Sequence, residues 1–101
     1  MKIKFSSLSE RDLDGIFLYI NDTLHNPTAA QNTINGIINL AAHLSDFPKI
    51  GVVLSMPNSS DLVIRYIVSG NYLIAYVIGT AHLEIVRILY ARSDYLRLLG
   101  K

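Results

Sequence analysis

The chain has two regions that differ in the spacing of their hydrophobic residues. In the first half, apolar residues recur three and four positions apart, which is the spacing of an amphipathic helix. Beyond residue 61 they alternate or run together in short segments rich in β-branched and aromatic residues, a pattern typical of strands. The pattern therefore predicts a helical region followed by a sheet.

The helical half predicts two helices joined by a tight turn. A short strand at residues 3–5 precedes the first helix, for which Ser9 is the expected N-cap and Asp12 the acidic partner of a capping box. Asn26 followed by Pro27 is a favourable cap and first position for the second helix. So short a connection makes the two helices antiparallel. The positions expected to face the core are Ile16, Phe17, Ile20 and Leu24 in the first helix, and Ala30, Ile34, Ile37, Ile38, Ala41 and Leu44 in the second.

The second half predicts three strands, at residues 62–68, 72–78 and 82–90, after a loop over 51–61. Connectors as short as "SGN" and "GTA" allow only antiparallel neighbours, so the strands form a meander. The middle strand is apolar on both faces; we expect one face to carry the helical hairpin and the other to meet something else. Ser93 is the expected cap of a short C-terminal helix. The predicted fold class is α+β.

Composition narrows the class of protein. A length of 101 residues suits a single domain, 1–101, with one hydrophobic core. Half of the residues are hydrophobic and 17% are charged, which excludes wholesale disorder and favours a surface covered by a partner. Because there is no cysteine, disulfides and thiolate metal sites are excluded. With no signal-peptide pattern and no apolar run near the ~20 residues of a membrane span, we expect a soluble, cytoplasmic protein that does not enter a membrane.

Charge is unevenly distributed along the chain. Residues 10–46 hold one base and five acids, a net charge of −4, whereas residues 62–101 hold five bases and two acids, a net charge of +3. A basic half suits an acidic or phosphate-rich partner, although dedicated nucleic-acid-binding domains usually have a pI above ~9. An ordinary solvated face is the other interpretation.

The order of these elements, together with five segments inside them, resembles the RelE/ParE superfamily of toxins from bacterial type II toxin–antitoxin modules. The five segments follow the superfamily's order and spacing: "DLDGIFLYI", "NPTAAQNTINGI", "LSDFPKIG", "IRYIVSGNYLIAYVI" and "VRILYARSDYLRLL". The resemblance implies a RelE/ParE-like fold, with a short N-terminal strand and an antiparallel helical hairpin packed on an antiparallel sheet. It also implies a small toxin that a cognate antitoxin wraps and holds inactive in a hetero-oligomer.

The superfamily has two branches, and each implies a different target. ParE-like members poison DNA gyrase without hydrolytic chemistry, whereas RelE-like members cleave messenger RNA in the ribosomal A site. Either branch implies growth inhibition, a role in plasmid stabilisation, and contact with operator DNA only indirectly, through the antitoxin. Neither implies a cofactor.

Three residues are the candidates for catalysis if the chain is RelE-like. Metal-independent RNA cleavage needs a base, an acid and cations that hold the phosphate. By the resemblance, Arg65 stands where ribosome-dependent members place a catalytic arginine, and Tyr90 where several place a tyrosine or histidine; Arg87 would support them. The alternative is that each arginine pairs with Glu84, an acid of the helices or the antitoxin, since a charge in an apolar strand row needs a partner. Tyr90 is then a packing residue, opposite Arg87 unless the strand bulges.

Other features depart from the RelE pattern. RelE-type enzymes are strongly basic, with lysines in the helical and loop region, whereas here that region is acidic and Lys49 is its only lysine. His82 begins its strand and does not stand beside Tyr90, and His25 and His43 have no ligand-spaced partner, so no metal site is expected.

The leading hypothesis is accordingly a ParE-like toxin that acts by protein binding on a replication target such as DNA gyrase. Arg92, Arg97 and Tyr95, beyond the last strand, are the residues expected to contact that target. The rival is a ribosome-dependent messenger-RNA endonuclease. A third hypothesis is a degenerate toxin that retains only antitoxin binding.

Overall fold

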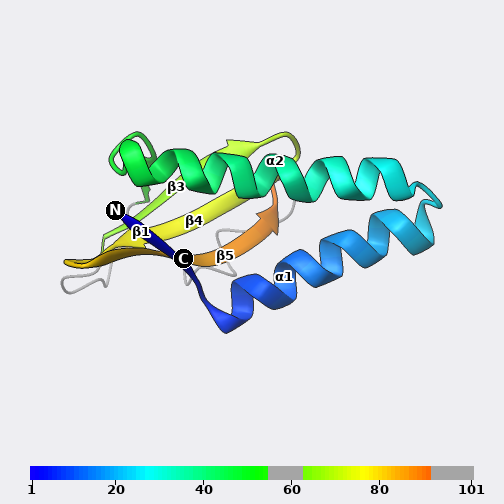
Figure 1. The fold of residues 1–101 in the computed structure, drawn as a ribbon, viewed down its shortest axis with the longest axis horizontal. Helices are drawn as coiled ribbons and strands as arrows, with labels where there is room; N and C mark the ends of the chain where they lie inside the picture. The colour runs from blue at the N-terminus through cyan, green and yellow to red at the C-terminus, as the bar shows by residue number, and fades with distance from the viewer. Residues whose placement is uncertain (55–62, 92–101) are drawn as a thin grey trace.

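The computed structural model describes residues 1–54 and 63–91 (Figure 1). Its strands form one five-stranded sheet in the order β1-β5-β4-β3-β2, and the helices lie on one face of that sheet. This confirms the predicted α+β class, a helical hairpin on a sheet that includes a three-stranded meander. The elements are β1 (Lys2–Phe5), α1 (Ser7–Leu18), the π-helix η1 (Tyr19–Thr23), α2 (Pro27–Asp46), β2 (Val52–Leu54), β3 (Ile64–Ser69), β4 (Tyr72–Ile78) and β5 (His82–Tyr90).

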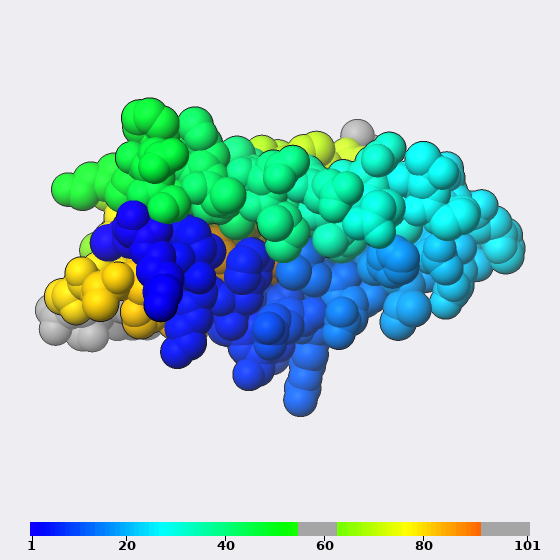
Figure 2. All heavy atoms as spheres, in the orientation of Figure 1, coloured from blue at the N-terminus to red at the C-terminus, as the bar shows by residue number. Residues whose placement is uncertain are grey.

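The core lies between α2 and the central strands β4 and β5. Figure 2 shows that the side chains of β1, α1 and α2 cover most of the sheet on this face. Each fully buried aliphatic or aromatic side chain stabilises the fold by roughly 1.5–3 kcal/mol relative to an exposed one. The buried cluster consists of Ile37, Ala41 and Leu44 from α2, Ile74 and Tyr76 from β4, and Leu83, Ile85 and Ile88 from β5.

Two positions predicted to face the core are exposed. Leu24 is 53% exposed because the tip of the helical hairpin extends past the sheet (Figure 1). Ile38 is 40% exposed, since Ile37 beside it takes the position that faces the sheet. The helical period was correct, but it does not show where the sheet ends beneath a helix.

The first helix begins earlier than its capping signal predicts. Its N-cap is Ser6, whose Oγ accepts a hydrogen bond from the backbone N of Ser9 at 3.0 Å. The expected Ser9 cap is therefore wrong, and so is the capping box with Asp12. The chain turns at Ser6 because its backbone N already donates to Ile85 O, at 3.0 Å, where β1 leaves the sheet. The predicted Asn26 cap of α2 is confirmed by the 3.0 Å bond from Ala29 N to its side chain.

Both edge strands add detail that the hydrophobic pattern does not contain. β1 pairs in parallel with the first half of β5, Lys2 with His82 through Phe5 with Ile85, so the sheet is mixed. β2 lies inside the predicted loop and pairs antiparallel with β3. A three-residue strand is too short to show a period in sequence.

A β-bulge in β5 changes which side chains face the helices. Ala75 pairs with Arg87 but its neighbour Tyr76 pairs with Ile85, so Val86 is an extra residue without a partner on β4. Beyond the bulge, Ile88 and Tyr90 face the helical side, and Arg87 lies on the opposite face beside Ala75. The sequence left open whether this strand bulges before Tyr90. A bulge is present, but it precedes Arg87, so Tyr90 still lies on the face opposite Arg87.

Glycine at position 51 is required by close packing. A Cβ there would lie 2.8 Å from Cε1 of Tyr76 and 2.9 Å from the carbonyl O of Tyr66. Tyr76 is fully buried and its hydroxyl is fixed, because it donates to Pro48 O at 2.7 Å and accepts from Gly51 N at 2.9 Å.

We therefore expect Gly51→Ala to lower the free energy of unfolding by about 1–3 kcal/mol, because the added methyl group must displace Tyr76 or strand β3. Urea denaturation followed by circular dichroism measures the change. Gly15→Ala is the matched control: nothing lies within 4 Å of a Cβ at that helical position, so it should raise stability by about 0.5–1 kcal/mol. Equal effects of the two substitutions would contradict the packing argument.

Candidate functional site

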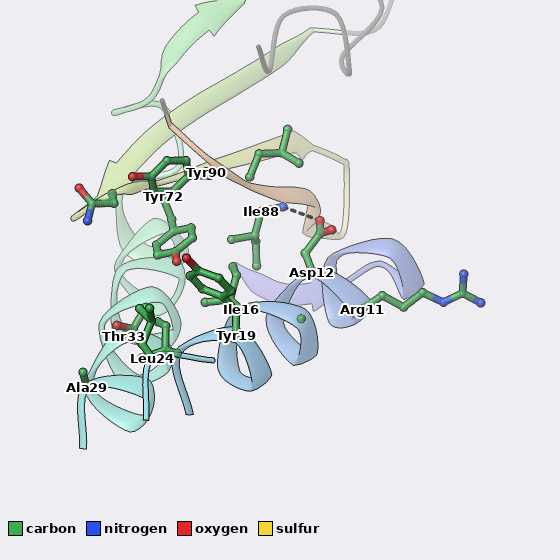
Figure 3. A pocket seen from close by; sticks show the side chains of 14 residues that line it. Arg11, Asp12, Ile16, Tyr19, Leu24, Ala29, Thr33, Tyr72, Ile88 and Tyr90 are labelled. Atoms are coloured by element: carbon green, nitrogen blue, oxygen red, sulfur yellow. Dashed lines mark hydrogen bonds between the residues drawn. The ribbon is translucent and has the colours of Figure 1, made fainter. Parts of the chain in front are cut away.

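An open groove of about 770 Å³ lies between the helical hairpin and the ends of β4 and β5 (Figure 3). Figure 1 shows α1 and α2 close together at the tip and spread apart toward the sheet, with the end of β5 between them. The helical wall includes Gly15, Ile16 and Tyr19, and the strand wall includes Tyr72, Ile88 and Tyr90. We refer to this feature as the tyrosine groove.

Three tyrosines give the groove its chemical character. The rings of Tyr72 and Tyr90 meet edge to face, with centroids 5.7 Å apart and an interplanar angle of 65°. Burial raises the pKa of the Tyr72 hydroxyl above its ordinary value, and the nearby hydroxyls of Tyr90 and Tyr19 raise it further. Tyr19 is 54% exposed and Tyr90 42% exposed. The groove therefore offers aromatic surface that remains accessible to another molecule.

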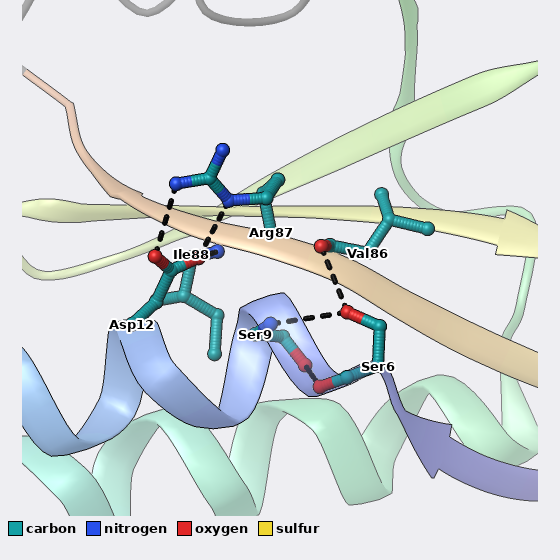
Figure 4. A network of polar contacts seen from close by, with 6 residues as sticks. All are labelled: Ser6, Ser9, Asp12, Val86, Arg87 and Ile88. Carbon is teal, nitrogen blue, oxygen red and sulfur yellow. Dashed lines mark hydrogen bonds and ion pairs between the residues drawn. The ribbon is translucent and has the colours of Figure 1, made fainter.

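Asp12 and Arg87 form the ion pair that joins α1 to β5 (Figure 4). Nε of Arg87 donates to Oδ2 of Asp12 at 2.8 Å, and Nη2 donates to Oδ1 at 3.0 Å. The same Oδ2 accepts the backbone N–H of Ile88 at 2.8 Å. The hydrogen bonds to Asp12 raise the pKa of Arg87, while partial burial opposes the increase. Arg87 is thus held by an acid of the helices, which was one of the partners expected for it.

The start of α1 continues the contact with β5 where β1 ends. Oγ of Ser6 donates to the carbonyl O of Val86 at 3.0 Å, one residue after the last contact of β1. Asp12 then accepts from Ile88 N, so side chains of the helix satisfy backbone groups along this edge of β5. β1 and the start of α1 therefore cover this edge of β5 as far as Ile88, which lines the tyrosine groove.

Arg65 is bound by backbone carbonyls. Its Nη1 donates to Gly51 O at 3.1 Å and to Lys49 O at 3.4 Å, in the connection between α2 and β2. Tyr76, its neighbour across the sheet, holds the same connection through Pro48 O and Gly51 N. Burial raises the pKa of Tyr76, whereas the bond from Gly51 and the charge of Arg65 lower it. In the described part of the chain Arg65 therefore pairs neither with Glu84 nor with an acid of the helices, two of the partners considered for it. Backbone acceptors leave no signal in a sequence.

The three candidates for catalysis do not converge on one site. Arg65 lies opposite Tyr76 and Tyr90 lies opposite Tyr72, four residues away along β4, which is a separation of roughly 13 Å. Arg87 projects from the other face and is engaged by Asp12. Of the candidates, only Tyr90 lines the groove. Arg92, Arg97 and Tyr95, and the expected Ser93 cap, lie outside the described residues.

Sequence reasoning missed the tyrosine groove. Tyr19, Tyr72 and Gly15 were not recognised as site residues, because the groove exists only once the first helix lies against strands some 60–70 residues later in the chain. The one available signal was Gly15, a glycine inside a helical period without a turn to explain it.

Within residues 1–54 and 63–91, no helix is long and apolar enough to cross a membrane. The same part of the chain contains no group of three or more histidine or acidic side chains arranged to hold a metal ion.

Comparison with known proteins identifies the family. A family model described as "ParE toxin of type II toxin-antitoxin system, parDE" matches residues 3–95. The chain therefore belongs to the ParE toxin family, within the superfamily that its segments resemble. Comparison with curated protein sequences finds no match.

Two solved structures share the fold. The first, from the chromosomal ParDE system of P. aeruginosa, has a TM-score of 0.75 and 18% sequence identity, and the match covers 91% of this chain and 97% of that one. The second, from the archaeal RelE-RelB complex of Pyrococcus horikoshii OT3, has a TM-score of 0.59 and 14% identity over the same shares of the two chains.

Replacing Asp12 by alanine should lower the free energy of unfolding by about 2–3 kcal/mol, because Arg87 and the N–H of Ile88 both lose their acceptor. Urea denaturation measures the loss. Asp12→Asn should recover part of it, since its amide oxygen still accepts from Ile88. The control is Asp14→Ala, an exposed acid on the same helix, which should change stability by less than about 0.5 kcal/mol. A comparable loss in the control would show that helix charge alone is responsible.

Stability should also fall at alkaline pH. The folded state raises the pKa of Tyr72 and Tyr76 above the ordinary value of 10.0, so it holds these protons more tightly than the unfolded state does. The contribution of these two hydroxyls to the free energy of unfolding is complete below about pH 10, and it is lost as the pH rises through their folded-state pKa values. Urea midpoints measured across that range should decline less in Tyr72→Phe than in the unmodified protein; an unchanged decline would exclude Tyr72 as a source.

Proposed function

We propose that this ParE-type toxin inhibits growth by binding DNA gyrase and that a cognate antitoxin neutralises it. The observation that carries the proposal is the ParE family match over residues 3–95, nearly the whole chain. In this proposal the toxin acts in the cytoplasm and serves plasmid stabilisation.

The arrangement of the arginines supports binding rather than hydrolysis. Arg65 is bound to the carbonyls of Lys49 and Gly51, and Arg87 is bound to Asp12. An arginine that stabilises a phosphate transition state must offer its donors to the phosphate oxygens. Cleavage of RNA at either arginine would therefore first require these internal bonds to break.

The accessible apolar surface supports a protein partner. The tyrosine groove joins exposed side chains at the hairpin tip, where Leu18 and Leu24 are 55% and 53% exposed. The two solved relatives are described as parts of a ParDE system and of a RelE-RelB complex, which supports an antitoxin as the partner of this chain also. We propose that operator DNA is contacted only through that antitoxin, and that Arg92, Arg97 and Tyr95 contact the target.

A supercoiling reaction tests the proposed target. Purified toxin, added to gyrase, ATP and relaxed plasmid, should block the appearance of supercoiled DNA at near-stoichiometric amounts, because a bound protein stops an essential step. Addition of purified antitoxin should restore supercoiling. Far-UV circular dichroism of the same preparation shows that the toxin is folded. Undiminished supercoiling in the presence of excess folded toxin would refute the proposal.

A translating extract provides the contrasting measurement. Under the proposal, messenger RNA remains intact when the toxin is added. Codon-positioned cuts that disappear in Arg65→Ala but persist in His82→Ala would instead establish the RelE-type activity. Intact message together with undiminished supercoiling and retained antitoxin binding would identify a toxin without target activity.

A further inference from the structure

A second exposed apolar patch lies at the end of α2 that is remote from the hairpin tip (Figure 1). It occupies the connection between α2 and β2 together with the start of β2, and none of its members lines the tyrosine groove. Four of the seven residues from 47 to 53 are apolar and 51–56% exposed: Phe47, Ile50, Val52 and Val53. We refer to these four residues as the β2 patch. A cluster of exposed apolar side chains, unlike a single one, indicates an interaction surface.

The backbone beneath the β2 patch is held from inside the fold. The hydroxyl of Tyr76 donates to Pro48 O at 2.7 Å and accepts from Gly51 N at 2.9 Å. Nη1 of Arg65 donates to Gly51 O at 3.1 Å. Tyr76 is fully buried, and a Cβ at position 51 would collide with its ring. The exposed side chains are therefore presented on a fixed backbone, which reduces the entropy lost when a partner binds.

β2 is an edge strand, and in the described part of the chain no strand pairs with its outer side. The strand at the other edge, β1, carries the exposed side chains of Lys2 and Lys4. Charges on an edge strand discourage a further strand from pairing with it. β2 instead presents Val52 and Val53, and it contains neither a charge nor a proline. An edge of this composition favours the addition of an extended segment from another chain.

Charge beside the β2 patch adds a requirement for that segment. Lys49 is exposed between Phe47 and Ile50. Its carbonyl O accepts from Nη1 of Arg65 at 3.4 Å, so a second positive group lies at this connection. Asp46, the last residue of α2, is the acid nearest in sequence, and two bases against one acid leave the connection basic. A segment that carries a carboxylate is therefore favoured over one that carries a base.

We propose that the β2 patch is a surface through which the toxin binds its target protein. The target contributes an extended apolar segment that lies beside β2, contacts Ile50 and Val53, and places a carboxylate near Lys49. The tyrosine groove and the hairpin tip supply apolar surface for the antitoxin, so the separate β2 patch is assigned to the second proposed partner. The inference rests on the proposed gyrase target and adds the surface of the toxin and the chemistry of the segment bound there.

A charge on the edge strand tests the contact. Val53→Glu should raise the toxin concentration that half-inhibits gyrase in the supercoiling reaction at least about tenfold, because it removes apolar surface and repels the carboxylate. Its affinity for purified antitoxin, measured by calorimetric titration, should not change. Val68→Glu is the matched control, since Val68 is also 51% exposed but lies in β3 beyond the residues that pair with β2. This control should inhibit gyrase as the unmodified toxin does.

Two further variants separate contact from folding and charge from shape. Val53→Thr keeps the β-branched shape that suits a strand, and it should raise the half-inhibiting concentration about fourfold, the effect of one buried methyl group. Lys49→Glu should also weaken inhibition, and more so at low salt, whereas Lys2→Glu at the other edge should not. Melting temperatures of all variants, followed by circular dichroism, show that each is folded in the reaction.

The outcomes distinguish the surface from the target. Inhibition by Val53→Glu and Val53→Thr equal to that of the unmodified toxin would overturn the surface and leave gyrase as the target. Failure of the unmodified, folded toxin to inhibit gyrase would overturn the proposed target itself. Loss of antitoxin affinity in Val53→Glu would overturn the inference and assign the β2 patch to the antitoxin. If light scattering showed that Val53→Glu converts a dimer to a monomer that still inhibits, the occupant would instead be a second copy of the chain.

Discussion

The carboxylate of Asp12 holds together parts of the chain that are distant in sequence. It accepts two hydrogen bonds from Arg87 and one from the backbone of Ile88, so α1 is fixed to β5 just beyond the bulge. Because β1 ends before this point, the helix supplies the contacts that a neighbouring strand would otherwise provide. The position of α1 along β5 also sets the width of the tyrosine groove, which has one wall on each element.

The two arginines of the apolar strands, Arg65 and Arg87, have structural partners here. Arg65 binds backbone carbonyls of the connection between α2 and β2, and Tyr76 binds the same connection through its hydroxyl. A buried or half-buried charge is tolerated only when such partners compensate for lost solvation. An arginine inside an apolar row is therefore weak support for catalysis unless its donors are directed toward a shared cavity.

Hydrophobic periods were sufficient to predict the hairpin, the meander and the α+β class. They could not predict the parallel pairing of β1 or the three-residue β2, because pairing is decided between distant segments and short strands have no period. The N-cap was assigned to Ser9 rather than Ser6 because both are serines near the helix start, and the choice depends on where β1 leaves the sheet. For the candidate site, Tyr90 is the one catalytic candidate that lines the groove, and its neighbours Tyr19 and Tyr72 join it only through tertiary contacts.

The contacts between the start of α1 and β5 join segments that are far apart in the sequence. Ser6 bonds to Val86 across 80 positions, and Asp12 bonds to Arg87 across 75. Closing loops of that length is entropically costly, and folds dominated by such contacts form slowly. The first strand therefore waits without its neighbour until β5 has left the ribosome. During synthesis the groove has only its helical wall until β4 and β5 have been made, so its second wall is added long after the first.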